Sequence, residues 1–367
     1  MKIAIYGLGI VGFGVYDILT NNEFFDSIMI KWVLDKDVSK KDLIKNSRLT
    51  ANLDEILNDK EVSLVVETMG AGEFSYHAIK QSLLKGKHVI TANKEVIALH
   101  LEELTKIKKE KNVSLYFEAS VGGGIPLIAP LIEISKTNEF KTIKGILNGT
   151  TNFILTKMQD EDLSFEEAVK LAQLKGFAEA NPSADLRGLD MVRKIVILSM
   201  IAFKMKISVD NVYHYGIENL KKEDIISIRN NDYILKLVAA SYYVDNKLSL
   251  IVEPILISKT NVLANVKNEF NYCEVDCSIN GLLGFYGKGA GRYPTANAMV
   301  NDIISVIENK ENYTFKNVKL TKIAKFDRIA SYYIRYKSGE VAYIKSLERN
   351  KLLGMLGSIE FYARIEE

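Results

Sequence analysis

The chain of 367 residues contains only two cysteines, Cys273 and Cys277, and only four histidines. Two cysteines cannot build a disulfide framework, so the composition suits a protein of the reducing cytoplasm. The four histidines have none of the spacings that are typical of metal sites. The scarcity of both residue types argues against a secreted, disulfide-bonded domain and against a zinc enzyme.

Excess charge of one sign and long apolar runs are missing as well. The net charge is +2, so we expect neither nucleic acid nor an acidic membrane surface as a partner. No apolar run reaches the length of a transmembrane helix. Residues 2–6 lead directly into a glycine turn, which is not the pattern of a signal peptide. With 47% hydrophobic and 26% charged residues, the composition indicates a globular protein, and its length predicts two domains with a small third piece.

A glycine motif stands at the very start of the chain. Residues 2–6 predict a buried strand, and Gly7, Gly9 and Gly12, with Ile10 and Val11 between them, form G-x-G-x-x-G before an apolar helical pattern. In that context the helix N-terminus can hold a pyrophosphate. The alternative is an ordinary glycine turn, but the full context favours dinucleotide binding.

The end of the second predicted strand, residues 28–34, is ambiguous about the cofactor. An acidic side chain there binds the ribose of NAD, whereas a cation accepts the extra phosphate of NADP. Asp35 and Lys36 offer both, and Lys40 and Lys41 add positive charge nearby.

Strands and helices then continue to alternate, which predicts a doubly wound parallel sheet with ligands at the carboxyl ends of its strands. The predicted strands are residues 63–67, 88–91 and 113–118, and the predicted helices are residues 74–84 and 101–111. Thr91, Asn93 and Lys94 come at the end of the strand predicted at residues 88–91. Lys94 should therefore lie at the carboxyl ends of the strands, where ligands bind. Glu118 and the glycine-rich residues after it either form a hinge or bind a hard cation through oxygen atoms; the sequence favours neither.

The pattern changes after residue 147. A polar turn, residues 148–152, opens a helix near residues 153–158, and a second helix spans residues 165–174. Alternating segments at residues 233–257 and 271–279 predict antiparallel strands of a second domain. Residues 286–295 form a second glycine-rich loop before a helix, which is either a domain connection or backbone that closes over the cofactor.

Residues 176–194 concentrate three carboxylates and a lysine: Glu179, Asp185, Asp190 and Lys194. Asp190 and Lys194 are i,i+4 neighbours on one helix face beside an apolar stripe. Spacing alone favours a solvated surface pair over a lysine with an orienting carboxylate at a cleft.

Taken in order, these segments resemble homoserine dehydrogenases over residues 1 to about 310. The motifs that carry the resemblance are residues 7–12, 86–94, 118–126, 148–152, 176–194 and 287–295. The resemblance implies a nicotinamide-dependent interconversion of L-homoserine and L-aspartate 4-semialdehyde, in the pathway to threonine, methionine and isoleucine. It also implies an α/β fold, with a Rossmann-type parallel sheet domain, an α+β substrate and dimerisation domain with a mostly antiparallel sheet, and a short C-terminal extension.

The implied boundaries are residues 1–134 for the dinucleotide-binding domain, rejoined by a helix at 293–310, then residues 135–292 for the substrate domain. Residues 311–367 form the extension. Residues 329–336 resemble the first strand of the regulatory ACT domain found in many members, but the remainder is too short for a complete one. We therefore expect no threonine feedback inhibition and instead a truncated tail that packs in a homodimer.

The resemblance also implies roles for individual residues. Lys194 is the acid–base residue, Asp190 orients it, and Lys94 polarises the reacting oxygen or steers the cofactor. The implied substrate-binding residues are Glu179, Asp185, Asn148, Gly149, Thr150 and Thr151. The implied cofactor-binding residues are Gly7, Gly9, Ile10, Val11, Gly12, Lys36, Thr91, Asn93, Lys94 and Gly291. The implied ligands of a monovalent cation, sodium, are Glu118 and the carbonyls of Val121, Gly123 and Ile125.

Two departures from the family pattern affect these expectations. Asn181 stands where members usually have Asp, which removes one charge beside the substrate ammonium. Lys36 stands where NADP-preferring members often have Arg, and since a lysine can also meet a phosphate, we expect NADP, with NAD as the alternative.

Two competing functions remain open. An acylating semialdehyde dehydrogenase shares the two-domain plan but needs a cysteine nucleophile, and Cys273 and Cys277 lie in a predicted strand far from the cleft residues. A non-catalytic NAD(P)H-binding sensor would explain the glycine motif but leaves Asp190 and Lys194 without a purpose.

Overall fold

The computed structural model describes residues 1–310, 313 and 322–366. The chain divides into two compact units, which we describe separately. Unit 1 comprises Met1–Thr137, Met200–Lys206 and Lys288–Lys319, and unit 2 comprises Asn138–Ser199, Ile207–Gly287 and Leu320–Glu367.

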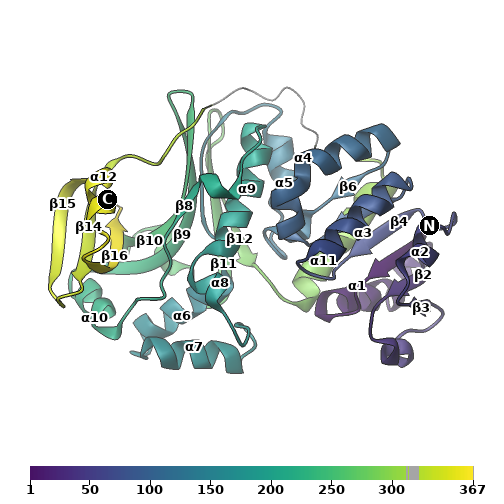
Figure 1. The fold of residues 1–367 in the computed structure, drawn as a ribbon, viewed down its shortest axis with the longest axis horizontal. Helices are drawn as coiled ribbons and strands as arrows, with labels where there is room; N and C mark the ends of the chain where they lie inside the picture. Colours follow the sequence, from purple (N-terminus) through teal and green to yellow (C-terminus); the bar gives the residue numbers. More distant parts are fainter. Residues whose placement is uncertain (311–312, 314–321, 367) are drawn as a thin grey trace. The chain divides into compact units, whose positions relative to one another are not determined.

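Unit 1 is built on a six-stranded parallel sheet with the order β3-β2-β1-β4-β5-β6 (Figure 1). The strand order reverses between β1 and β4, which is where ligands bind in doubly wound sheets. The strands are β1 (Lys2–Tyr6), β2 (Met29–Leu34), β3 (Arg48–Thr50), β4 (Leu64–Glu67), β5 (His88–Thr91) and β6 (Leu115–Tyr116).

Helices cover both faces of this sheet, as the alternation of strands and helices predicts. The helices are α1 (Ile10–Thr20), α2 (Leu53–Leu57), α3 (Glu73–Leu84), α4 (Lys94–Lys111), α5 (Ile128–Ile134) and α11 (Arg292–Ile307). The returning helix α11 packs beside α1, where a Cβ on Gly14 would lie 3.0 Å from the Ala296 Cβ. This close contact explains why a glycine stands in the middle of α1.

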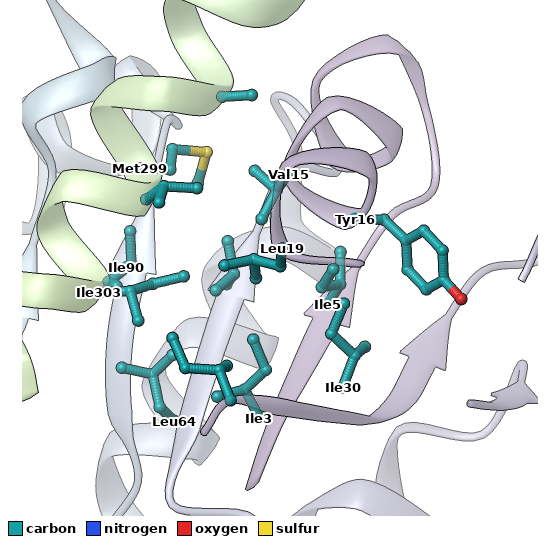
Figure 2. Packing of buried hydrophobic residues seen from close by; sticks show 14 of the residues in the cluster. Ile3, Ile5, Val15, Tyr16, Leu19, Ile30, Leu64, Ile90, Met299 and Ile303 are labelled. Carbon is teal, nitrogen blue, oxygen red and sulfur yellow. The ribbon is translucent and has the colours of Figure 1, made fainter. Parts of the chain in front are cut away.

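The core of unit 1 lies on both faces of β1, because successive side chains of a strand point to opposite faces. Ile3 and Ile5 pack toward α1 and α11, where Figure 2 shows them in one cluster with Leu19, Met299 and Ile303. The residues that alternate with them pack toward α2 and α3 on the other face. The central strand is therefore hydrophobic throughout, as a parallel sheet covered on both faces requires.

Unit 2 is built on a mixed, mostly antiparallel sheet with the order β12-β11-β7-β9-β10-β16-β14-β15, with β8 and β13 paired to β10. Its strands are β7 (Phe140–Ile146), β8 (Val212–His214), β9 (Tyr233–Val244), β10 (Lys247–Ser258), β11 (Phe270–Cys277), β12 (Gly281–Lys288), β13 (Lys322–Ile323), β14 (Ile329–Tyr336), β15 (Val341–Glu348) and β16 (Ile359–Ile365). Its helices are α6 (Gly149–Asp160), α7 (Phe165–Leu174), α8 (Ser183–Leu186), α9 (Leu189–Phe203, whose end belongs to unit 1), α10 (Lys222–Asn230) and α12 (Arg349–Met355). The expected fold class is confirmed.

The last segment of the chain, yellow in Figure 1, continues the sheet of unit 2. The expected strand at residues 329–336 is present as β14, and β16 lies between β10 and β14. Two buried arginines, Arg349 and Arg364, donate to the two carboxylate oxygens of Glu253 on β10, at 2.7 and 2.6 Å. Residues 311–312 and 314–321 of the expected extension lie outside the described part of the chain.

Several predicted element boundaries are wrong. The helix predicted at residues 101–111 begins at Lys94, because the Asn93 side chain caps its first turn. The helix predicted at 153–158 begins at Gly149, capped in the same way by Asn148. The antiparallel strands predicted at 233–257 are present as the hairpin of β9 and β10, whereas β12 was not predicted. Among the described residues, no helix is both long and apolar enough to cross a membrane.

Candidate active site

The glycine motif forms the turn between β1 and α1. Its glycines are needed for different physical reasons. A Cβ on Gly12 would lie 2.0 Å from the Gly7 carbonyl oxygen, so packing alone demands a glycine there. A Cβ on Gly9 would meet nothing within 4 Å. Gly9 is the N-cap of α1 and supplies no side-chain hydrogen bond, and Ile10 in the first turn is exposed. The open helix N-terminus therefore suits an anion.

Asp35 follows β2 and its carboxylate is used by the protein itself. Oδ2 accepts from the Leu8 backbone N–H at 2.7 Å and from the Lys40 ammonium at 2.8 Å, and Oδ1 accepts from Asp37 N–H at 2.9 Å. Burial raises the pKa of Asp35, but the hydrogen bonds from Lys40, Asp37 and Leu8 outweigh it and leave the pKa below its ordinary value. Asp35 thus fixes the glycine loop, while Lys36 is exposed.

Thr91, Asn93 and Lys94 stand at the carboxyl end of β5. Asn93 caps α4 through its Oδ1, and its Nδ2 donates to the Gly70 carbonyl in the loop after β4. Lys94 is the first residue of α4 and is half-buried. The sheet topology therefore puts these residues beside the glycine motif, at the edge where strands β1, β4 and β5 end.

The two later glycine-rich loops pack against each other in unit 1. A Cβ on Gly123 would lie 2.4 Å from the Gly289 carbonyl oxygen, and Gly124 N–H donates to the Lys288 carbonyl at 3.1 Å. Gly291 then begins α11 with a φ of 122°, which favours glycine. Arg292 follows it and lies over the ring of Phe13 on α1, at 4.6 Å. Close backbone approach accounts for the glycines of both loops.

Glu118, the expected cation ligand, caps a helix. Its two carboxylate oxygens accept from the backbone N–H groups of Leu127, Ile128 and Ala129 at 2.6 to 2.7 Å. The pKa of Glu118 lies above its ordinary value, because burial raises it by more than these three hydrogen bonds lower it. The second buried carboxylate, Asp302, accepts from Glu118 N–H at 3.1 Å; burial and then the charge of Glu118 raise its pKa well above the ordinary value.

The other three expected cation ligands are backbone carbonyls in the same loop, those of Val121, Gly123 and Ile125. Val121 and Ile125 are 1% and 3% exposed. In the described part of the chain, none of the three carbonyl oxygens accepts a hydrogen bond. Carbonyls without donors, in a buried loop that follows Glu118, fit the oxygen ligands that a hard cation prefers.

The carboxylates and the lysine of residues 176–194 meet the N-terminus of α6. Asn148 Nδ2 donates to Asp185 Oδ1 at 2.8 Å and to Asp190 Oδ2 at 2.9 Å. Lys194 Nζ lies 2.9 Å from Asp190 Oδ2 and donates to the Leu147 carbonyl at 2.6 Å. One asparagine therefore joins the two aspartates, and Asp190 joins the lysine to them.

Burial decides what kind of pair Asp190 and Lys194 form. Their side chains are 5% and 9% exposed. The surface pair that spacing alone favours is therefore wrong, because α9 packs this face against the rest of unit 2. Taking two charges out of water costs several kcal/mol unless hydrogen bonds compensate. A buried pair is therefore weak evidence for a stabilising role and stronger evidence for a catalytic one.

The remaining expected substrate residues lie around this cluster with one exception. Thr151 donates to Asn148 Oδ1, Thr150 Oγ1 donates to the Phe177 carbonyl at 2.5 Å, and Gly149 approaches the backbone of Glu269. Glu179 is exposed, and among the described residues its carboxylate makes no hydrogen bond with the cluster. The hydrogen bonds of the described residues therefore do not connect Glu179 to the other acids.

Sequence reasoning missed the Leu147 carbonyl, Asp302 and Glu67. A backbone carbonyl leaves no signature in a sequence, and Asp302 sits in an ordinary helical pattern. Glu67, a fully buried acid at the end of β4, was within reach of prediction, because a charged residue that ends a buried strand stands at the ligand edge of the sheet.

The two cysteines are buried and free on β11. Burial raises the pKa of Cys273 to about 12 and also raises that of Cys277, so neither forms a thiolate readily. Because the thiolate is the nucleophile, this disfavours the acylating semialdehyde dehydrogenase.

Gly12→Ala and Gly9→Ala should separate packing from ligand binding. We expect Gly12→Ala to lower the free energy of unfolding by about 1–3 kcal/mol, because its Cβ has no room. Gly9→Ala should leave that free energy within about 0.5 kcal/mol but weaken NADPH binding, since its Cβ fills the space where a pyrophosphate would approach. Denaturant unfolding and fluorescence titration measure the two effects. Unchanged NADPH binding in Gly9→Ala would contradict the assignment of this loop.

Comparison with known proteins gives a consistent result. Two family models match: one for the homoserine dehydrogenase NAD-binding domain over residues 7–118 and one for homoserine dehydrogenase over residues 126–304. The homoserine dehydrogenase of Bacillus subtilis (strain 168) is 38% identical over 320 residues, which cover 84% of this chain and 73% of that protein. The enzyme of Synechocystis is also 38% identical, with the same coverage.

Solved structures agree with this result. A homoserine dehydrogenase from Thiobacillus denitrificans matches with a TM-score of 0.90 and 28% identity, covering 100% of this chain and 98% of that one. A homoserine dehydrogenase from S. aureus, at pH 8.5, matches with a TM-score of 0.81 and 33% identity over the same shares. The resemblance noted in the sequence is thus confirmed. The chain belongs to the homoserine dehydrogenase family, NAD(P)-dependent oxidoreductases that interconvert L-homoserine and L-aspartate 4-semialdehyde.

Proposed function

We propose that Lys194 is the acid–base residue of this homoserine dehydrogenase, with Asp190 as its orienting partner. The observation that carries the proposal is the position of the Lys194 ammonium, held between Asp190 Oδ2 and the Leu147 carbonyl and shielded from solvent. A base must lie within hydrogen-bond reach of the proton that it moves, and two fixed contacts hold Nζ in one position.

The chemistry follows from these contacts. When bound, the nicotinamide would supply the acceptor for the hydride of the hydroxyl carbon, and Lys194 takes the hydroxyl proton. In the reverse direction, the protonated lysine gives its proton to the oxygen when the aldehyde is reduced. Homoserine oxidation needs the neutral amine, so its rate should rise with pH.

The surrounding acids suit a cationic substrate group. Asp185 and Glu179 are proposed to hold the substrate amino group, with Asn148, Gly149, Thr150 and Thr151 completing the pocket. Support is strongest for Asp185, which the Asn148 amide holds in the cluster, and weakest for the exposed Glu179.

Lys194→Met should lower kcat/KM for homoserine by roughly 10²–10⁴-fold, the usual contribution of a general base, and leave NADPH affinity unchanged. Lys206→Met is the matched control, because Lys206 is 75% exposed and pairs with the exposed Glu102 in unit 1. Steady-state rates at the nicotinamide absorbance and fluorescence titration measure both effects. Turnover of Lys194→Met within a few-fold of the wild type would refute the role.

We further propose that unit 1 binds the nucleotide and that NADP is preferred. The proposed contacts are the glycine motif, Lys36, Thr91, Asn93, Lys94 and Gly291, with Lys94 also facing the reacting oxygen. Support for NADP comes from Asp35, whose carboxylate already accepts from Leu8, Asp37 and Lys40 and so has less capacity to accept from ribose hydroxyls. Lys36 is exposed beside it and can meet a phosphate.

Lys36→Ala should lower the ratio of kcat/KM for NADP to that for NAD by about tenfold or more, because a charge-assisted contact to the phosphate is lost. Lys60→Ala is the control, since Lys60 is exposed just before β4, at the opposite edge of the sheet. Parallel assays with both nucleotides give the ratio. An unchanged ratio in Lys36→Ala would show that this lysine does not contact the phosphate.

We propose that Glu118 and the carbonyls of Val121, Gly123 and Ile125 bind sodium, beside the buried Asp302. Sodium chloride should then raise the midpoint of thermal unfolding more than choline chloride does, because an ion that binds only the folded state stabilises it. Glu118→Gln should remove the difference, whereas Glu133→Gln, an exposed change on α5, should keep it. Equal midpoints in both salts for the wild type would exclude the site.

A homodimer and a cytoplasmic location are also proposed. The edge strand β12 exposes Leu282 and Tyr286, and an edge strand of this kind is a ready surface for a second copy. A sedimentation mass of one chain would exclude the dimer.

Two free, buried cysteines suit a reducing compartment, and cell fractionation can test the proposed cytoplasmic location.

A further inference from the structure

Arg292 is a cation that belongs neither to the substrate cluster nor to the expected cofactor contacts. It is the first residue of α11, directly after Gly291, and α11 packs beside α1 (Figure 1). The Arg292 Cγ and carbonyl oxygen would each lie 3.1 Å from a Cβ on Gly14. The aliphatic part of the Arg292 side chain therefore packs against α1 where the missing side chain of Gly14 leaves room.

The guanidinium of Arg292 lies beside the first turn of α1. Its carbon Cζ is 4.6 Å from the ring centroid of Phe13 and 5.1 Å from that of Tyr293. Phe13 N–H donates to the Gly9 carbonyl at 2.9 Å, so Phe13 stands one turn after the N-cap. Because helical side chains lean toward the helix N-terminus, the Phe13 ring covers the turn that Gly9 begins. The guanidinium on that ring is therefore on the side of the open N-terminus of α1.

The charge of Arg292 lacks a counter-ion in the described part of the chain. The side chain is half-buried, its Nε atom is buried, and none of the described residues accepts a hydrogen bond from Nε. Asp17, one turn after Phe13 on α1, instead accepts from the Tyr293 hydroxyl at 2.8 Å. A buried N–H group without an acceptor is costly, so Arg292 is suited to a partner that the protein itself does not supply.

The stacking of Arg292 indicates what kind of partner this is. A guanidinium that lies on a ring keeps its N–H groups at its edge, where their planar arrangement matches the oxygen atoms of a phosphate. The two rings also hold the guanidinium in place before a ligand arrives, which lowers the entropic cost of binding. An anion at the N-terminus of α1 would thus meet both the backbone N–H groups of the helix and Arg292.

We propose that Arg292 binds the pyrophosphate of the nucleotide, together with the backbone N–H groups at the N-terminus of α1. The proposal rests on the proposed nucleotide site at the glycine motif. It assigns to Arg292 no contact with the 2′-phosphate of NADP, which is proposed for Lys36. Lys36 follows β2 on one side of β1, whereas α11 packs against β5, which lies on the other side of β1.

Arg292→Met should raise the dissociation constants of NADPH and NADH by about the same factor, roughly tenfold or more. Both nucleotides contain the pyrophosphate, and each loses one charge-assisted contact. Arg292→Lys should recover part of the affinity, because the charge remains while the planar, stacked group is lost. Fluorescence titration measures both constants. The difference between the wild type and Arg292→Met should shrink at high salt, which screens the charge.

Arg328→Met is the matched control. Arg328, an exposed residue of unit 2, also stacks on two rings, with its Cζ 4.4 Å from the centroid of Tyr242 and 5.5 Å from that of Phe326. Its replacement removes the same kind of stacking contact and should leave both dissociation constants unchanged. If Arg292→Met does not fold, Arg292→Gln provides the same test, since glutamine keeps a planar polar group without the charge.

Gly9→Ala separates the possible failures. Weakened binding in Gly9→Ala, together with wild-type affinity in Arg292→Met, would refute the role of Arg292 and leave the nucleotide site standing. Unchanged affinity in both variants would refute the proposed nucleotide site as well. A loss in Arg292→Met that is confined to NADPH would also overturn the proposal, because it would place the contact on the 2′-phosphate.

Discussion

The side chain of Asn148 holds the charges of the substrate cluster in one place. Its oxygen caps α6, while its nitrogen donates to both Asp185 and Asp190. That shared donor ties the two carboxylates to one side chain. Because Asp190 in turn contacts Lys194, the position of the lysine depends on the same residue that caps α6.

Most of the first unit could be predicted from the sequence, because its signals are local. A hydrophobic strand, a glycine turn and an amphipathic helix recur in order, and such repetition permits few topologies. The boundaries of its helices were harder to predict. Asn93 and Asn148 begin their helices several residues before the apolar pattern does, since a cap depends on one side chain rather than on a period.

The substrate cluster could be predicted only through the family resemblance. Residue spacing places Asp190 and Lys194 on one helix face but does not say whether that face meets water or protein. Packing between distant elements decides this, and it buries both side chains. The Leu147 carbonyl that accepts from Lys194 is a backbone group, which every residue has. No pattern of residue types could therefore reveal it. The role of Asn181, where the family usually has Asp, is explained by nothing in the structure.

The position of β16 inside the second sheet bears on how the protein is made. β10 pairs with β16 in parallel, and about a hundred residues separate the two strands along the chain. On the ribosome, β9 and β10 emerge long before residue 359 does, and the end of β10 at Ile255 and Leu256 stays without its partner β16 until then. Because unpaired strand edges attract other chains, a nascent chain of this length is exposed to aggregation during synthesis. A slow stretch of translation before β16 would prolong that exposure, which gives codon usage in this region a physical consequence.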